Sequence, residues 1–145
     1  MTTAAVVAYY RNEHEVLISY AGHPPVLYKR VTDEMWSFAT PPDREIQSDN
    51  SPMNLPFDIF PDTEYRQFAI QLESGDRLFV YTDGITEAFN PEGELFGKDR
   101  LKDILDQNGS LPLSELKSAV LRALHRYTNK GLTHDDITLI ALEIC

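Results

Sequence analysis

The stretch DRLFVYTDGITEA, residues 76–88, decides the fold expected for this chain. Its apolar run, from Leu78 to Tyr81, is followed almost at once by Asp83 and Gly84. A short run that is apolar at successive positions predicts a strand covered on both faces. The end of a strand held in this way is rigid. The stretch therefore predicts a buried strand that delivers the Asp83 carboxylate at its tip.

The Asp83-Gly84 pair has two interpretations. After a strand, Asp-Gly is first of all a turn signal, and turn chemistry alone explains it. Gly84 also lacks a Cβ, so it permits a tight turn and lets the backbone approach an ion or a phosphate closely. A binding function for Asp83 therefore needs support from elsewhere in the chain.

Composition predicts one cytoplasmic domain that spans residues 1–145. The single cysteine, Cys145, rules out an intrachain disulfide and is typical of a reducing compartment. No apolar run reaches the roughly 18 residues of a membrane span, and the N-terminus lacks the regions of a signal peptide. We therefore expect no membrane association.

The charge balance argues against nucleic acid as a partner. The chain has 13 basic and 23 acidic residues, a net charge of −10, and Lys29-Arg30 is its longest basic run. Binding to a phosphate backbone needs a basic surface, which this composition does not provide. The carboxylate surplus is compatible with cation binding, although solvated surface explains most of it.

Hydrophobic periodicity predicts strands followed by helices and a closing strand. The first three strands are expected to form an antiparallel meander over residues 2–30. Two amphipathic helices are expected to pack on a sheet. The proline-rich segment 40–62 is either a functional flap or an irregular connection. The expected strands are residues 2–10, 14–21, 26–29, 35–39, 64–72, 78–81 and 137–142, and the expected helices are 98–107 and 112–127.

Asp135 and Asp136 immediately precede the closing apolar run. If that strand is an antiparallel neighbour of the strand that ends before Asp83, all three carboxylates lie at one end of the sheet. Carboxylates gathered in this way repel one another unless a cation compensates them. Oxygen ligands without a Cys favour Mg²⁺ or Mn²⁺ over Zn²⁺. On spacing alone, turn chemistry and a metal site both remain open for these residues.

Four segments together resemble a known family: residues 21–25 (AGHPP), 75–88, 96–101 (FGKDRL) and 135–139 (DDITL). Their order and separation are similar to those of the metal-dependent protein phosphatases (PPM, or protein phosphatase 2C), in the bacterial SpoIIE/RsbU-like branch. The resemblance implies an α+β fold, an antiparallel β-sandwich flanked by helices. It also implies removal of phosphate from phosphoserine or phosphothreonine in a protein partner, commonly a STAS-domain anti-anti-sigma factor in a bacterial regulatory switch.

The resemblance assigns roles at matching positions only. It makes Asp83 and Asp135 metal ligands, with Asp136 as the alternative ligand beside Asp135. Gly84 and His23 take supporting positions. It implies a centre of two Mn²⁺ or Mg²⁺ ions that activates water for in-line attack on phosphorus.

The chain departs from the family pattern in one important respect. It has neither the early Asp-containing strand nor the Asp-x-x-Gly-His-Gly motif, which supply the remaining metal ligands. We therefore expect a phosphatase domain truncated at its N-terminus, with an incomplete metal centre and an exposed sheet edge that favours self-association. The alternative is a non-catalytic module, or inactive fragment, that binds a partner.

Overall fold

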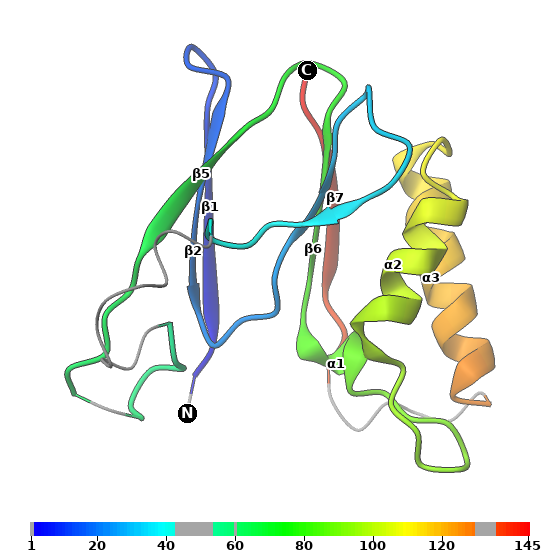
Figure 1. Ribbon diagram of the computed structural model, residues 1–145. Coiled ribbons are helices and arrows are strands. Elements are labelled where there is room, and N and C mark those ends of the chain that lie inside the picture. The colour runs from blue at the N-terminus through cyan, green and yellow to red at the C-terminus, as the bar shows by residue number, and fades with distance from the viewer. Residues whose placement is uncertain (1, 43–53, 60, 130–135) are drawn as a thin grey trace. The chain divides into compact units, whose positions relative to one another are not determined.

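The computed structural model describes residues 2–42, 54–59, 61–129 and 136–145. The chain divides into two compact units, one made of Met1–Pro25 and Ala39–Glu73, the other of Val26–Phe38 and Ser74–Cys145. Each unit has its own antiparallel sheet, and the helices belong to the second unit (Figure 1). The mixed α+β class predicted from the sequence is confirmed.

The first unit contains a three-stranded sheet in the order β1-β2-β5. Its strands are β1 (Ala4–Tyr10), β2 (Glu15–Ala21) and β5 (Gln67–Gln71), and both strand pairs are antiparallel. Alternate residues of β2, among them Val16 and Ile18, are fully buried, as a half-buried strand requires. The hydroxyl of Tyr20 donates a 2.8 Å hydrogen bond to the carbonyl of Ala39. This bond fixes the point at which the chain returns to the first unit.

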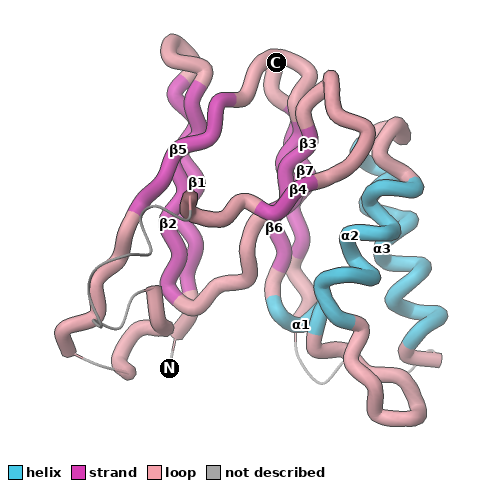
Figure 2. The backbone as a smooth tube through the Cα atoms, in the orientation of Figure 1, coloured by secondary structure: helices cyan, strands magenta, loops and turns pink. Residues whose placement is uncertain are grey.

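The second unit contains a four-stranded sheet in the order β4-β3-β6-β7. The strands are β3 (Leu27–Lys29), β4 (Ser37–Phe38), β6 (Arg77–Tyr81) and β7 (Leu139–Glu143). The short helix α1 (Asp83–Thr86) follows β6, and α2 (Gly97–Gln107) and α3 (Leu113–Tyr127) run alongside this sheet (Figure 2). Leu78, Phe79 and Tyr81 are at most 1% exposed, so the prediction that β6 is a buried strand is confirmed.

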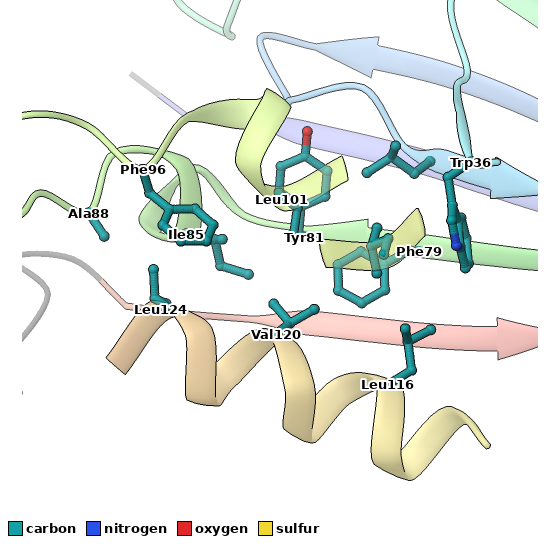
Figure 3. Close-up of a cluster of buried hydrophobic side chains, with 12 residues drawn as sticks. Trp36, Phe79, Tyr81, Ile85, Ala88, Phe96, Leu101, Leu116, Val120 and Leu124 are labelled. Atoms are coloured by element: carbon teal, nitrogen blue, oxygen red, sulfur yellow. The ribbon is translucent and has the colours of Figure 1, made fainter. Parts of the chain in front are cut away.

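Apolar stripes on the two long helices form the core of the second unit. Leu116, Val120 and Leu124, four residues apart on α3, project into one cluster of buried side chains that includes Phe79 and Tyr81 of β6 (Figure 3). The spacing of four places these three side chains on one face of the helix. The amphipathic helices predicted from the sequence are therefore confirmed, and their stripes are explained by packing.

The predicted meander over residues 2–30 is wrong. β3 does not pair with β2; it pairs with β4 and β6 in the sheet of the second unit. The reason lies between the strands, where Gly22 has a φ of 63° and two prolines follow. Proline has no N–H to donate to a strand partner, so pairing along β2 stops there.

β7 differs from its sequence pattern in its burial. The apolar run predicted cover on both faces, but Ile140 is 49% exposed and Leu142 is 43% exposed. Their neighbours Leu139 and Ala141 pack against the helix-covered core. β7 is the last strand of its sheet among the described residues, so a second strand does not flank it there. Self-association through such an edge stays a prediction.

Two expectations from the sequence can be compared with the described residues only in part. Most of the proline-rich segment, residues 43–53 and residue 60, lies outside them, so the flap interpretation stays a prediction. Among the described helices, none is both long enough and apolar enough to cross a membrane.

Candidate metal centre

The end of β6 and the beginning of β7 lie side by side. The two strands are antiparallel neighbours, and their last pair at this end joins Tyr81 to Leu139. Asp83 follows β6 by two residues, and Asp136 precedes β7 by three. The antiparallel arrangement on which the sequence argument depended is therefore present.

Thr82 ties the two chain segments together. Its N–H donates to the carbonyl of Thr138 at 3.0 Å. Its side-chain oxygen accepts from the N–H of Thr138, also at 3.0 Å. The hydroxyl lies within donating distance of two carbonyls, that of Asp136 at 3.3 Å and that of Thr138 at 3.4 Å. One side chain thus fixes the residue before Asp83 to the segment that contains Asp136.

The backbone of Asp83 is held by α1. The N–H of Glu87 donates to the Asp83 carbonyl at 2.8 Å, and the Thr86 hydroxyl donates to the same oxygen at 3.2 Å. Ile85, in the same helix, is fully buried and anchors it in the core. The half-buried Asp83 carboxylate has no hydrogen bond or ion pair within the described part of the chain. Its oxygens are thus available to an external ligand.

The conformational reason given for Gly84 is wrong. Gly84 lies inside α1, is buried, and is not among the glycines with positive φ. The segment is a short helix rather than a tight Asp-Gly turn, so glycine is not required there for its φ angle. A role for Gly84 in allowing a close approach of the backbone stays a prediction.

The donor atoms of the described residues here are of the kind that suits a hard divalent cation. Carboxylate oxygens are the ligands that Mg²⁺ and Mn²⁺ favour. Asp135, the second expected ligand, lies outside the described residues, and Asp136 is exposed. Over the described ranges, no three His, Cys, Asp or Glu residues form a group that could hold a metal. The assignments of Asp83, Asp135 and Asp136 as ligands stay predictions.

His23 is oriented by its own turn. Its Nδ1 lies 2.7 Å from the carbonyl oxygen of Pro24, which can only accept, so Nδ1 carries the proton. The ring also stacks on Tyr20, with 6.4 Å between centroids and 9° between planes. His23 belongs to the first unit and Asp83 to the second. The observed contacts of His23 shape the Gly-His-Pro turn, and a further role stays a prediction.

Two residues that fix the two ends of β6 were not predicted from the sequence. Thr82 is one; a hydroxyl side chain directly before the Asp-Gly pair was the available signal. Asp76 is the other: it is 3% exposed, and its Oδ1 accepts a 2.7 Å hydrogen bond from the N–H of Val31. That bond anchors the start of β6 to the loop after β3.

Comparison with known proteins identifies the family. The family model for Stage II sporulation protein E (SpoIIE) matches residues 1–144. The chain belongs to the SpoIIE family. Phosphoserine phosphatase RsbU of Bacillus subtilis is 28% identical over 134 residues, which are 92% of this chain and 36% of RsbU. The predicted resemblance to the SpoIIE/RsbU-like branch of the PPM phosphatases is confirmed.

Solved structures show the same fold. The SiaA-PP2C domain of Pseudomonas aeruginosa matches 99% of this chain and 52% of its own with a TM-score of 0.75 and 21% identity. The phosphatase domain of SpoIIE from Bacillus subtilis matches 98% of this chain and 56% of its own with a TM-score of 0.71 and 17% identity. This SpoIIE-family chain thus has the fold of PP2C phosphatase domains and spans about half the length of these two.

Proposed function

We propose that this chain forms part of a metal-dependent protein serine/threonine phosphatase. Its substrate would be a phosphorylated protein, such as a STAS-domain anti-anti-sigma factor of a bacterial regulatory switch, and it would act in the cytoplasm. One observation carries the proposal: in a SpoIIE-family chain, Asp83 leaves the buried strand β6 directly beside the segment that enters β7. RsbU and RsbP of Bacillus subtilis, two relatives, are phosphoserine phosphatases.

Asp83 and Asp135 would hold the metal, with Asp136 as the alternative to Asp135. Mn²⁺ or Mg²⁺ bound there would neutralise charge on the phosphoryl oxygens and would lower the pKa of a bound water molecule. The chain's own contribution is positional. The bonds from Thr86 and Glu87 to the Asp83 carbonyl hold the backbone of the ligand, so little ordering is needed when a cation arrives.

The remaining ligands would come from a segment N-terminal to this chain. The described residues hold no complete ligand group, and the chain spans 36% of RsbU and 52% of the SiaA-PP2C domain chain. Because the chain spans only this share of its relatives, the second candidate function is a non-catalytic module that binds a phosphorylated partner without hydrolysing it.

A comparison of two proteins tests both functions. Manganese-dependent phosphate release from a phosphorylated STAS-domain protein is measured for this chain and for a form extended at its N-terminus to the length of a whole PP2C phosphatase domain. We expect turnover in the extended form and little or none in the chain alone. If both forms bind the phosphorylated protein but neither releases phosphate, the enzyme proposal fails and the binding module is favoured.

A further inference from the structure

A second polar site lies at the opposite end of β6 from Asp83. It is a pocket of about 300 Å³ in the second unit, and three basic side chains line it, those of Lys29, Arg30 and Arg77. Arg77 begins β6 and Tyr81 ends it two residues before Asp83, so at about 3.3 Å per residue the strand alone separates the two ends by about 13 Å. The pocket is therefore distinct from the candidate metal centre.

The register of the sheet concentrates positive charge in this pocket. Lys29 and Arg77 lie directly opposite each other on β3 and β6, and like charges in that position destabilise a sheet. Glu143 of β7 is the single carboxylate among the residues lining the pocket. It is bonded to Arg77, with 2.7 Å between Nε and Oε2. The residues that line the pocket thus include three basic groups and one acidic group, in a chain whose net charge is −10; a further carboxylate, that of Asp33, lies 3.9 Å from Arg30.

Arg77 is held as a fixed donor. Its Nη1 donates to the carbonyls of Gly109 and Leu111 at 2.9 and 2.7 Å, while Nε is bonded to Glu143. The side chain is 17% exposed. Its remaining nitrogen, Nη2, makes no hydrogen bond with the described residues. A guanidinium fixed in this way loses little conformational entropy when it binds an anion.

Lys29 and Arg30 keep donors free beside it. The ammonium of Lys29 donates to the carbonyl of Asp33 at 2.6 Å, which uses one of its three N–H groups. The Arg30 guanidinium lies over the Tyr28 ring, with 5.2 Å from Cζ to the centroid, and makes a long contact of 3.9 Å with the Asp33 carboxylate. Neither contact uses its N–H donors fully, and such exposed ion pairs stabilise little. Gly75 and Gly109, which also line the pocket, contribute no side chain to fill it.

We propose that this pocket binds a small oxyanion of the phosphate class, either free phosphate or the phosphate group of a phosphorylated side chain. Guanidinium and ammonium groups side by side are the donors that recognise such oxygens. The volume lies at the lower end of the range for small-ligand pockets, roughly 300–1,000 Å³. A bound anion offsets the repulsion between Lys29 and Arg77. The proposal goes beyond the phosphatase function and does not depend on it.

A titration followed by ¹⁵N NMR tests the pocket. Inorganic phosphate and a phosphoserine peptide are added separately to the chain in EDTA, at constant ionic strength, with chloride as the reference anion. We expect saturable shifts at the amides of Gly75, Gly109 and Ser110. The double variant Lys29→Gln/Arg30→Gln should weaken binding at least tenfold. The matched control, Arg122→Gln on the exposed surface of α3, should leave it unchanged.

Three results separate the possibilities. If only inorganic phosphate changes the amide chemical shifts, the pocket is a site for free phosphate. If the phosphoserine peptide binds more strongly than inorganic phosphate, the pocket is a site for a phosphorylated side chain. Linear, unsaturated shifts, or equal binding by the double variant, overturn the proposal. Circular dichroism checks that each variant is folded. If the double variant is unfolded, the single variant Arg30→Gln, whose side chain is 40% exposed, takes its place in the titration. Because EDTA removes metal, Asp83→Asn should bind as the wild type does, so failure of the phosphatase proposal leaves this result intact.

Discussion

The N–H of Thr138 donates a 3.0 Å hydrogen bond to the side-chain oxygen of Thr82. Thr82 precedes Asp83 directly, and Thr138 follows Asp136 by two residues. The backbone bond from Thr82 to the carbonyl of Thr138 runs beside it. The distance between the Asp83 backbone and the segment before β7 is therefore set partly by a side chain, which a single substitution can remove.

Thr82→Val should loosen this connection while keeping the shape of the side chain. The loss of one hydrogen bond costs about 1 kcal/mol, so exchange of the Thr138 amide with solvent should accelerate about fivefold. Thr82→Ser keeps the hydroxyl and is the matched control; its exchange should stay close to that of the wild type. Equal protection of Thr138 in the Val variant would show that the backbone bond alone holds the two segments.

Asp83→Asn tests the ligand assignment. The substitution keeps size and removes charge, and no described residue pairs with the carboxylate, so thermal stability should change little. In the N-terminally extended protein, manganese-dependent phosphate release should fall by on the order of 100-fold or more, because loss even of outer ligand contacts costs 10–100-fold. Asp99→Asn, at an exposed position in the first turn of α2, is the control. Turnover near the wild-type level in Asp83→Asn would refute the assignment.

What could be predicted from the sequence was set by local apolar patterns. Two patterns each leave one stable way to bury their side chains. One is the apolar run from Leu78 to Tyr81, and the other is the four-residue spacing of Leu116, Val120 and Leu124. β6 and α3 were therefore predictable. The position of Asp83 beside the segment entering β7 also followed, because it needs only that two neighbouring strands run antiparallel.

The sheet to which each strand belongs was not predictable in the same way. β3 has three residues, and its sequence is equally compatible with pairing to β2 or to β6. The choice depends on long-range contacts, such as the pairing of Leu27 with Phe79. The contacts of Thr82 were hidden for a similar reason, since its partners lie 54 and 56 residues away in sequence.

Gly22→Ala should strongly destabilise the first unit. Gly22 has a φ of 63°, which a residue with a Cβ adopts at a cost. An added Cβ would also overlap the ring of Pro56, and the N–H of Gly22 is already committed to the Asn54 carbonyl at 2.7 Å. We expect a loss of roughly 2 kcal/mol or more in the free energy of unfolding, measured by urea denaturation.

Gly93→Ala provides a matched control for that substitution. Gly93 has a φ of 83°, but a Cβ there meets no atom within 4 Å. Its cost should therefore be limited to the backbone term, about 1 kcal/mol. Similar losses in the two variants would mean that overlap with Pro56 is relieved by a small shift of the loop.

Tyr81→Phe should stabilise the chain at neutral pH. Tyr81 is 1% exposed, and its hydroxyl is buried without a hydrogen-bond partner among the residues that the structure describes. A buried, unpartnered polar group costs about 1–3 kcal/mol, and the ring itself, which packs against Phe79, is kept in the variant. We expect the free energy of unfolding at pH 7 to rise by about 1 kcal/mol. A decrease would mean that the hydroxyl is hydrogen-bonded in solution.

The same variant should change the alkaline limit of stability. Burial raises the pKa of Tyr81 from 10.0 to about 12, so between these values the unfolded chain loses a proton that the folded chain retains. The stability linked to this proton is complete below pH 10 and is lost as the pH rises to 12. The wild type should therefore lose on the order of 2 kcal/mol more than Tyr81→Phe over this interval, because both proteins share every other titrating group. Parallel stability curves for the two proteins between pH 10 and 12 would show that the Tyr81 phenol ionises as readily in the folded chain as in the unfolded one.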